Sequence, residues 1–171
     1  MKCYQIEDVR HFMAELLSGE KYDSFYLYEA NINMALNYNI SGKINSGFYS
    51  SDEISELNIK EYITWGEIKP VIYDLIKGKR LPIGFRIILM FNRENITRLV
   101  EMNNLRIRPE DISSLVMNIN YGKYAGVLYE KQEEEGNTPG MLITTGTSLN
   151  IFTLDKTIEN LWNETVEKYY I

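Results

Sequence analysis

The sequence predicts an α+β domain with a mainly antiparallel sheet of about six strands and three to four helices. Some segments place apolar residues at intervals of three and four, as amphipathic helices do, and others alternate apolar with polar residues, as strands do. Turn residues between neighbouring strand segments indicate hairpins. With 171 residues, 44% of them apolar and 25% charged, the chain has the composition of one globular domain spanning 1–171.

The first elements are a helix and a strand pair. Apolar residues recur with helical spacing from Ile6 to Ser18, and Gly19 stands where a helix C-cap belongs. From Tyr26 to Ile40 the alternation is too long for one strand, so we expect a reversal near Asn33.

A polar connection over 45–62, with one short helical turn at 52–57, leads to the second helix. Pro70 lacks an N–H and is harmless only in a first turn. The helix should therefore begin near 67–69, or be kinked if the capping box that opens at Thr64 is its start.

The segment 83–91 is apolar on both faces and predicts a central strand. Arg86 is the exception within it and needs an anionic partner or a route to solvent. A third helix follows at 95–102.

Alternation over 115–121 predicts another strand, and Gly122 fits the first central position of a type II′ hairpin turn. We expect the hairpin partner at 125–129 and an exposed loop at 133–140.

The chain then supplies one bent strand or two short ones over 141–154, interrupted at Gly146. A last helix has Asp155 as its N-cap. A helix, strand, turn, strand order starts at Ile6 and again at Asn95, which suggests a helix–hairpin pseudo-repeat or chance recurrence of a common unit.

Cysteine and histidine counts exclude several kinds of site. With one Cys and one His, the chain cannot assemble a zinc site of three or four such ligands, nor an intrachain disulfide. Cys3 is either a reactive thiol or a small apolar filler. His11 falls on the polar side of the first helix, as a solvated side chain or as the base of a Cys3–His11 pair. We expect no metal site and no cofactor.

Catalytic motifs are missing from the sequence. Gly-Lys occurs at 42, 78 and 122 but is never followed by Ser or Thr, which excludes a P-loop, and G-x-G-x-x-G, G-x-S-x-G and H-E-x-x-H do not occur. The hydroxyl-rich run 144–148 is either a phosphate-binding stretch or simply strand sequence. We therefore predict no catalytic residue and favour a protein that is not an enzyme.

The longest apolar run, 87–91, is far shorter than a membrane span needs, and the N-terminus has no apolar leader region. We expect a cytoplasmic protein with no membrane partner.

Charge is distributed unevenly along the chain. The net charge is −6, yet the segment 69–108 holds nine basic and three acidic residues, and six of the seven arginines lie there. Arginine offers a planar fork that matches phosphate or carboxylate. The candidate binding residues are its arginines, Arg80, Arg86, Arg93, Arg98, Arg106 and Arg108. The alternative is that these charges pair with the acidic flanks inside the same fold.

The charge distribution and the missing catalytic motifs lead to two hypotheses about function. The favoured one is a non-catalytic binding or interaction module that contacts an anionic partner, protein or nucleic acid, through the basic segment 69–108. A sharper form is a homo-oligomeric, sliding-clamp-like ring, by analogy of element order. The alternative is a small enzyme acting on a phosphorylated or carboxylated metabolite held by arginines. It requires a pocket where guanidinium groups converge beside a carboxyl group with a raised pKa.

Four stretches of the chain resemble a family of uncharacterised bacterial proteins of unknown function. They read MKCYQIEDV, WGEIKPVIYDLIKGKRLP, RPEDISSLVMNINY and TGTSLNIFTLDKTIENLW. The resemblance implies a single-domain bacterial protein without an assigned activity, and it transfers no site residue.

Overall fold

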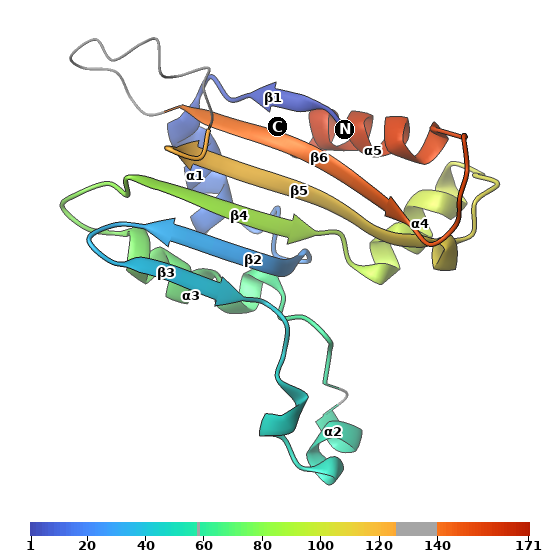
Figure 1. The fold of residues 1–171 in the computed structure, drawn as a ribbon, viewed down its shortest axis with the longest axis horizontal. Coiled ribbons are helices and arrows are strands. Elements are labelled where there is room, and N and C mark those ends of the chain that lie inside the picture. Colours follow the sequence, from blue (N-terminus) through green and yellow to red (C-terminus); the bar gives the residue numbers. More distant parts are fainter. Residues whose placement is uncertain (58, 126–139) are drawn as a thin grey trace.

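The fold is an antiparallel sheet with helices on one side (Figure 1). The computed structural model describes residues 1–57, 59–125 and 140–171. Within them, six strands form one sheet in the order β1-β6-β5-β4-β2-β3, and each neighbouring pair is antiparallel. The strands are β1 (Cys3–Gln5), β2 (Tyr26–Asn33), β3 (Asn37–Ser41), β4 (Gly84–Met90), β5 (Ile112–Gly122) and β6 (Met141–Leu149).

Five α-helices and two short 3-10 turns lie in the described residues. They are α1 (Val9–Ser18), η1 (Ser46–Phe48), α2 (Ser51–Leu57), α3 (Trp65–Ile76), α4 (Arg93–Met102), η2 (Pro109–Asp111) and α5 (Thr157–Tyr169). The α+β class and the antiparallel sheet are confirmed. The helix beyond the expected number is α2, which the sequence predicts only as a helical turn. No helix of the described part is long and apolar enough to cross a membrane.

Three of the helices pack on a single face of the sheet. Figure 1 shows α1, α3 and α5 behind the sheet and α4 at one end of it, whereas α2 sits on an arm that projects from the end of β3. Two tryptophans anchor this layer, and both are fully buried. The Trp65 indole N–H donates to the carbonyl of Leu16 at 2.8 Å, and that of Trp162 donates to the carbonyl of Val116 at 3.0 Å. Each tryptophan therefore buries its ring without leaving a polar atom unpaired.

The N-terminus differs from the prediction. The first helix begins at Val9, where Asp8 accepts a hydrogen bond from the backbone N–H of His11, rather than at Ile6. Ahead of it, Cys3–Gln5 forms the edge strand β1 and pairs with β6. Three residues are too few to show an alternation of apolar and polar side chains. This strand therefore forms because it pairs with β6, not because of a local sequence pattern.

At α3 the capping box is the true start. The Glu67 carboxylate accepts from the backbone N–H of Thr64 at 2.9 Å and from its hydroxyl at 2.5 Å. The helix runs from Trp65, with Pro70 inside it, so the expected start at 67–69 is wrong. The cap and the burial of Trp65 together outweigh the hydrogen bond that Pro70 cannot donate.

β6 and the start of α5 differ from the prediction. β6 is one strand that passes through Gly146 and ends at Leu149, so neither the predicted break at this glycine nor the extension to residue 154 occurs. Lys156, not Asp155, is the N-cap of α5, although the Asp155 carboxylate still accepts from the backbone N–H of Thr157 at 2.8 Å.

The turn after β5 is only partly within the described residues. Gly122 has a φ of +59°, and the N–H of Ala125 donates to its carbonyl at 2.9 Å. Ala125 lies in a bend rather than a strand. The remainder of the expected strand, 126–129, and the loop at 133–139 lie outside the described residues.

The helix–hairpin order occurs twice, as α1-β2-β3 and α4-β5-β6. The two hairpins flank β4, because β2 and β5 both pair with it in antiparallel fashion. β4 is thus the central strand that the sequence predicts.

Candidate functional site

The sheet has one face on which no helix of the described residues packs, here called the helix-free face. Along β5, the buried residues Met117 and Ile119 alternate with the half-buried Asn118 and Asn120. Directly opposed residues on neighbouring strands share a face. The pairing registers therefore place a row of amide and hydroxyl side chains there, Gln5, Asn31, Asn39, Asn118, Asn120 and Thr144.

Arg86 lies in the middle of the helix-free face. It is an exposed residue on the central strand, directly opposite Asn31 on one side and Asn120 on the other. It makes no ion pair and no side-chain hydrogen bond with any residue that the structure describes. The sequence requires either an anionic partner or access to solvent for Arg86. In the structure, its side chain reaches solvent.

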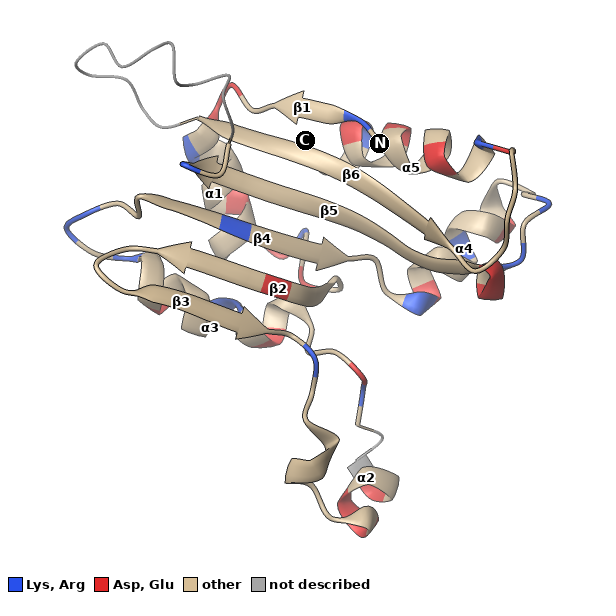
Figure 2. Ribbon diagram, viewed as in Figure 1, with Lys and Arg blue, Asp and Glu red and all other residues tan. Residues whose placement is uncertain are grey.

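Basic residues extend from Arg86 toward both ends of β4 (Figure 2). Lys79 and Arg80 are exposed in the loop before the strand, and Arg93 follows it at the start of α4. Three of the six predicted arginines therefore lie along the length of one strand, with Arg86 between the other two. An acidic residue on this face is Glu29 of β2, whose carboxylate accepts a hydrogen bond from Asn31.

Arg93 has a structural role that the sequence does not predict. Its guanidinium donates to the carbonyl of Ile112 at 2.6 Å and to that of Ser113 at 3.1 Å. It thereby ties the start of α4 to the start of β5. The positive charge is not neutralised by these carbonyl groups.

A groove of about 710 Å³ continues from Arg86 along the helix-free face. Its floor includes Ile88 and Met90, which follow Arg86 on the same face of β4. Tyr26, Tyr28 and Tyr62 line one side, and Ser113, Ser114 and Asn118 line the other. Arg93 closes the far end.

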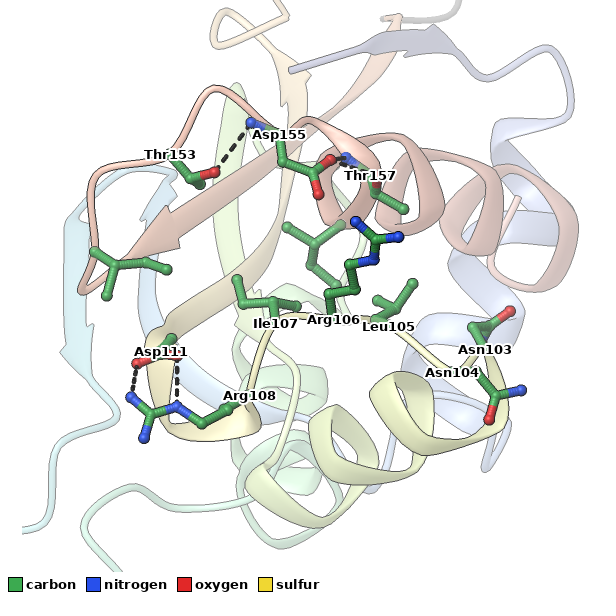
Figure 3. Close-up of a pocket in the computed structure, with 12 residues that line it drawn as sticks. Asn103, Asn104, Leu105, Arg106, Ile107, Arg108, Asp111, Thr153, Asp155 and Thr157 are labelled. Atoms are coloured by element: carbon green, nitrogen blue, oxygen red, sulfur yellow. Dashed lines mark hydrogen bonds and ion pairs between the residues drawn. The ribbon is translucent and has the colours of Figure 1, made fainter.

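Arg106 and Arg108 lie elsewhere, in a pocket of about 660 Å³ between the α4–β5 connection and the start of α5 (Figure 3). Arg108 binds Asp111 with two hydrogen bonds of 2.9 Å. The side chain of Arg106 points toward the start of α5, near Thr157. Two of the predicted guanidinium groups therefore do share a pocket with carboxylates.

The carboxyl groups of this pocket are not poised to act as acids. The hydrogen bond from the Arg108 side chain lowers the pKa of Asp111, and that from the Thr157 hydroxyl lowers the pKa of Asp155. A general acid at neutral pH needs a raised pKa. The carboxyl group with a raised pKa that the enzyme hypothesis requires is thus not provided by Asp111 or Asp155.

Of the remaining basic residues of the segment 69–108, some form ion pairs and others are exposed to solvent. Lys69 pairs with Asp23 at 2.5 Å and Lys77 with Asp74 at 2.6 Å. Pairing of an arginine with an acidic flank, the alternative drawn from the sequence, is seen for Arg108 and Asp111. Arg98 is exposed on α4, away from β4. The structure therefore spreads the segment over α3, β4, α4 and the pocket beside α5 instead of gathering it into one patch.

Cys3 and His11 are both exposed. Cys3 is therefore not the apolar filler that composition favours, and His11 is the surface residue that the helical pattern predicts.

The tyrosines and asparagines of the groove were not among the predicted site residues. Alternation places Asn118 and Asn120 on the polar face of a strand, but a polar face is ordinarily just a solvated one. Two features of the sequence could have indicated the groove. The polar positions of the strand that holds Asn118 and Asn120 carry amides rather than charged residues, and tyrosines occupy positions 26 and 28 of another strand.

Comparison with known proteins places the chain in a family. Residues 15–171 match a family described as a family of unknown function (DUF5721), which leaves only the first stretch of the resemblance outside the matched range. No curated protein and no solved structure matches the chain. The chain belongs to the family of unknown function DUF5721.

Proposed function

We propose that the protein is a non-catalytic binding module that holds an elongated anionic partner along β4, on the helix-free face. The observation that carries this proposal is Arg86, an exposed arginine in the middle of the central strand, without an ion pair in the described residues and flanked by Asn31 and Asn120. An exposed guanidinium without an ion pair can form charge-assisted hydrogen bonds with an anionic partner.

The basic residues before and after β4 support an elongated partner. The strand has seven residues, which at about 3.3 Å per residue spans roughly 23 Å. A partner that contacts Arg80, Arg86 and Arg93 together would be a polymer rather than a small metabolite.

The test is a titration of fluorescently labelled heparin oligosaccharide, a generic polyanion, by anisotropy at about 50 and 200 mM salt. We expect binding that weakens steeply with salt, weaker binding by Arg86→Gln, and wild-type binding by Arg98→Gln, the matched control on α4. Failure to bind at the lower salt, or an equal loss in both variants, would overturn the proposal.

The enzyme hypothesis is a second candidate because Arg106 and Arg108 share a pocket. It stands below the first, since Arg108 is already paired with Asp111 and both carboxylates there are held ionised.

The oligomeric form and the location complete the proposal. A clamp-like ring is one way for copies of the module to surround a polymer, and light scattering tests it, because a monomeric particle cannot form a ring. A bacterial source and the cytoplasmic location expected from the sequence are retained.

A further inference from the structure

We infer that the partner is single-stranded nucleic acid, whose bases stack on the tyrosines of the groove while its phosphates contact Arg86 of β4 and the basic residues before and after that strand. This inference rests on the proposed function and names the partner for that same face. Three features of the groove carry it: its aromatic side, its amide and hydroxyl side, and its charge.

The aromatic side consists of three tyrosines, with the rings of Tyr28 and Tyr62 stacked and that of Tyr26 tilted against Tyr62. The rings of Tyr28 and Tyr62 have centroids 6.0 Å apart and an angle of 26° between their planes. Tyr26 and Tyr62 are 6.4 Å apart at 33°. Tyr28 is 47% exposed although it lies in a strand. Exposed aromatic rings on a sheet surface are the groups on which unpaired bases stack.

The backbone holds Tyr28 and Tyr62 together. Gly42 donates its N–H to the carbonyl of Tyr28 at 3.1 Å, and its carbonyl accepts from Ile63 at 2.9 Å. The returning segment of the arm is thereby fixed beside β2, and Tyr62 with it. The ring cluster is built on backbone pairing rather than on freely moving side chains.

The opposite side of the groove offers hydrogen-bonding groups. Asn118 lies opposite Ile88 of the floor, and Ser113 and Ser114 also line the groove. Amide and hydroxyl groups donate and accept, so they match the edges of bases as well as sugar hydroxyls. The floor between the two sides is apolar, with Ile88 and Met90 at its centre.

Charge distinguishes a nucleic acid from an uncharged polymer, and the rings distinguish it from an acidic peptide. Arg86 lies before the groove, Arg93 closes it, and Lys60 lines it together with Glu61, whose carboxylate pairs with Lys43 at 3.8 Å. An acidic peptide would satisfy these cations but has no regularly spaced planar groups for the three tyrosines. A duplex would satisfy them too, but its bases are stacked on each other and cannot reach the rings.

The experiment compares three labelled 12-mers by fluorescence anisotropy at about 50 mM salt: oligo-dT, an abasic strand of the same charge, and a duplex. The proteins are wild type, Tyr28→Ala, Tyr28→Phe and, as the matched control, Tyr169→Ala, which removes a tyrosine of similar exposure on α5. Thermal unfolding of each variant shows whether it is folded.

We expect oligo-dT to bind wild type more tightly than the abasic strand or the duplex. Tyr28→Ala should weaken oligo-dT binding roughly 5- to 100-fold, which corresponds to the loss of one base stack. It should leave the abasic strand unaffected, and Tyr28→Phe and Tyr169→Ala should bind as wild type does.

The outcomes separate the inference from the proposed function. Equal binding of oligo-dT and the abasic strand, or tighter binding of the duplex, would overturn the inference and leave a polyanion-binding face. If no oligonucleotide binds while heparin does, the inference fails alone. If neither binds, both fail.

Discussion

Arg86 on β4 lies directly opposite Asn120 on β5, on the face of the sheet where no described helix packs. The pair places the positively charged guanidinium of Arg86 beside the neutral amide of Asn120 on the two central strands. No carboxylate of the described residues pairs with the guanidinium, and we propose that it contacts the anionic partner.

Replacing this cation should weaken binding without weakening the fold. We expect Arg86→Gln to lower polyanion affinity about fivefold and to reduce the slope of log affinity against log salt by about one. The free energy of unfolding should change by less than about 0.5 kcal/mol, since an exposed side chain without partners is removed. Salt-dependent anisotropy and urea unfolding measure the two effects. Arg98→Gln serves as the control, and an unchanged salt slope in Arg86→Gln would contradict the account.

Arg93, unlike Arg86, should also matter for the stability of the fold. Arg93→Ala removes two hydrogen bonds to the carbonyls of Ile112 and Ser113, so we expect a loss of about 1–2 kcal/mol in the free energy of unfolding. Arg93→Lys keeps the positive charge but loses the planar guanidinium that reaches both carbonyl groups, so it should recover only part of that stability. Urea denaturation checks both variants. Wild-type stability in Arg93→Ala would show that these hydrogen bonds are not formed in solution.

Gly42 should not tolerate a side chain. A Cβ there would lie 1.8 Å from the carbonyl oxygen of Leu27, a backbone atom that cannot move without disturbing β2. Gly42→Ala should therefore cost more than about 2 kcal/mol and disturb the Tyr28–Tyr62 stack. Gly78→Ala is the matched control, because a Cβ at that position meets nothing within 4 Å. Equal melting temperatures for the two variants would refute this packing.

The Glu67 cap should make stability depend on pH. Hydrogen bonds from the hydroxyl and then from the backbone N–H of Thr64 lower the pKa of Glu67. A carboxylate with a lowered pKa stabilises the fold above its unfolded-state pKa, about 4.3, and that stabilisation is lost as pH falls through the folded-state value. We expect Glu67→Gln to cost about 0.5–1 kcal/mol at pH 7 and much less near pH 3. Urea titrations at both pH values test this, and a pH-independent difference would count against a role for the charge.

Much of the sheet could be predicted because its strands repeat a local pattern. Alternation from Tyr26 onward predicts β2 and β3, and the apolar run around Ile87 predicts the central strand. β1 could not be predicted, since three residues carry no detectable period and the strand exists through its pairing with β6. The start of α3 depended on a competition between Pro70 and a cap, which only the packed structure decides.

The site was less predictable than the fold. Closeness in sequence suggested that the arginines of 69–108 form one surface, but the chain passes from strand to helix to loop within that segment. Arg86 therefore lies on the helix-free face, while Arg106 and Arg108 lie beside α5. Which face of the sheet stays uncovered is decided by the packing of α1, α3 and α5, and no local pattern contains that information.

The most direct test is to map the binding face by NMR. ¹⁵N-labelled protein would be titrated with oligo-dT or heparin, following the side-chain signals of Arg86, Asn118 and Asn120. The account predicts that these signals shift first and furthest, together with the backbone of β4, while Arg106 and Arg108 stay in place. Shifts confined to Arg106 and Arg108 would contradict it and move the site to the pocket beside α5.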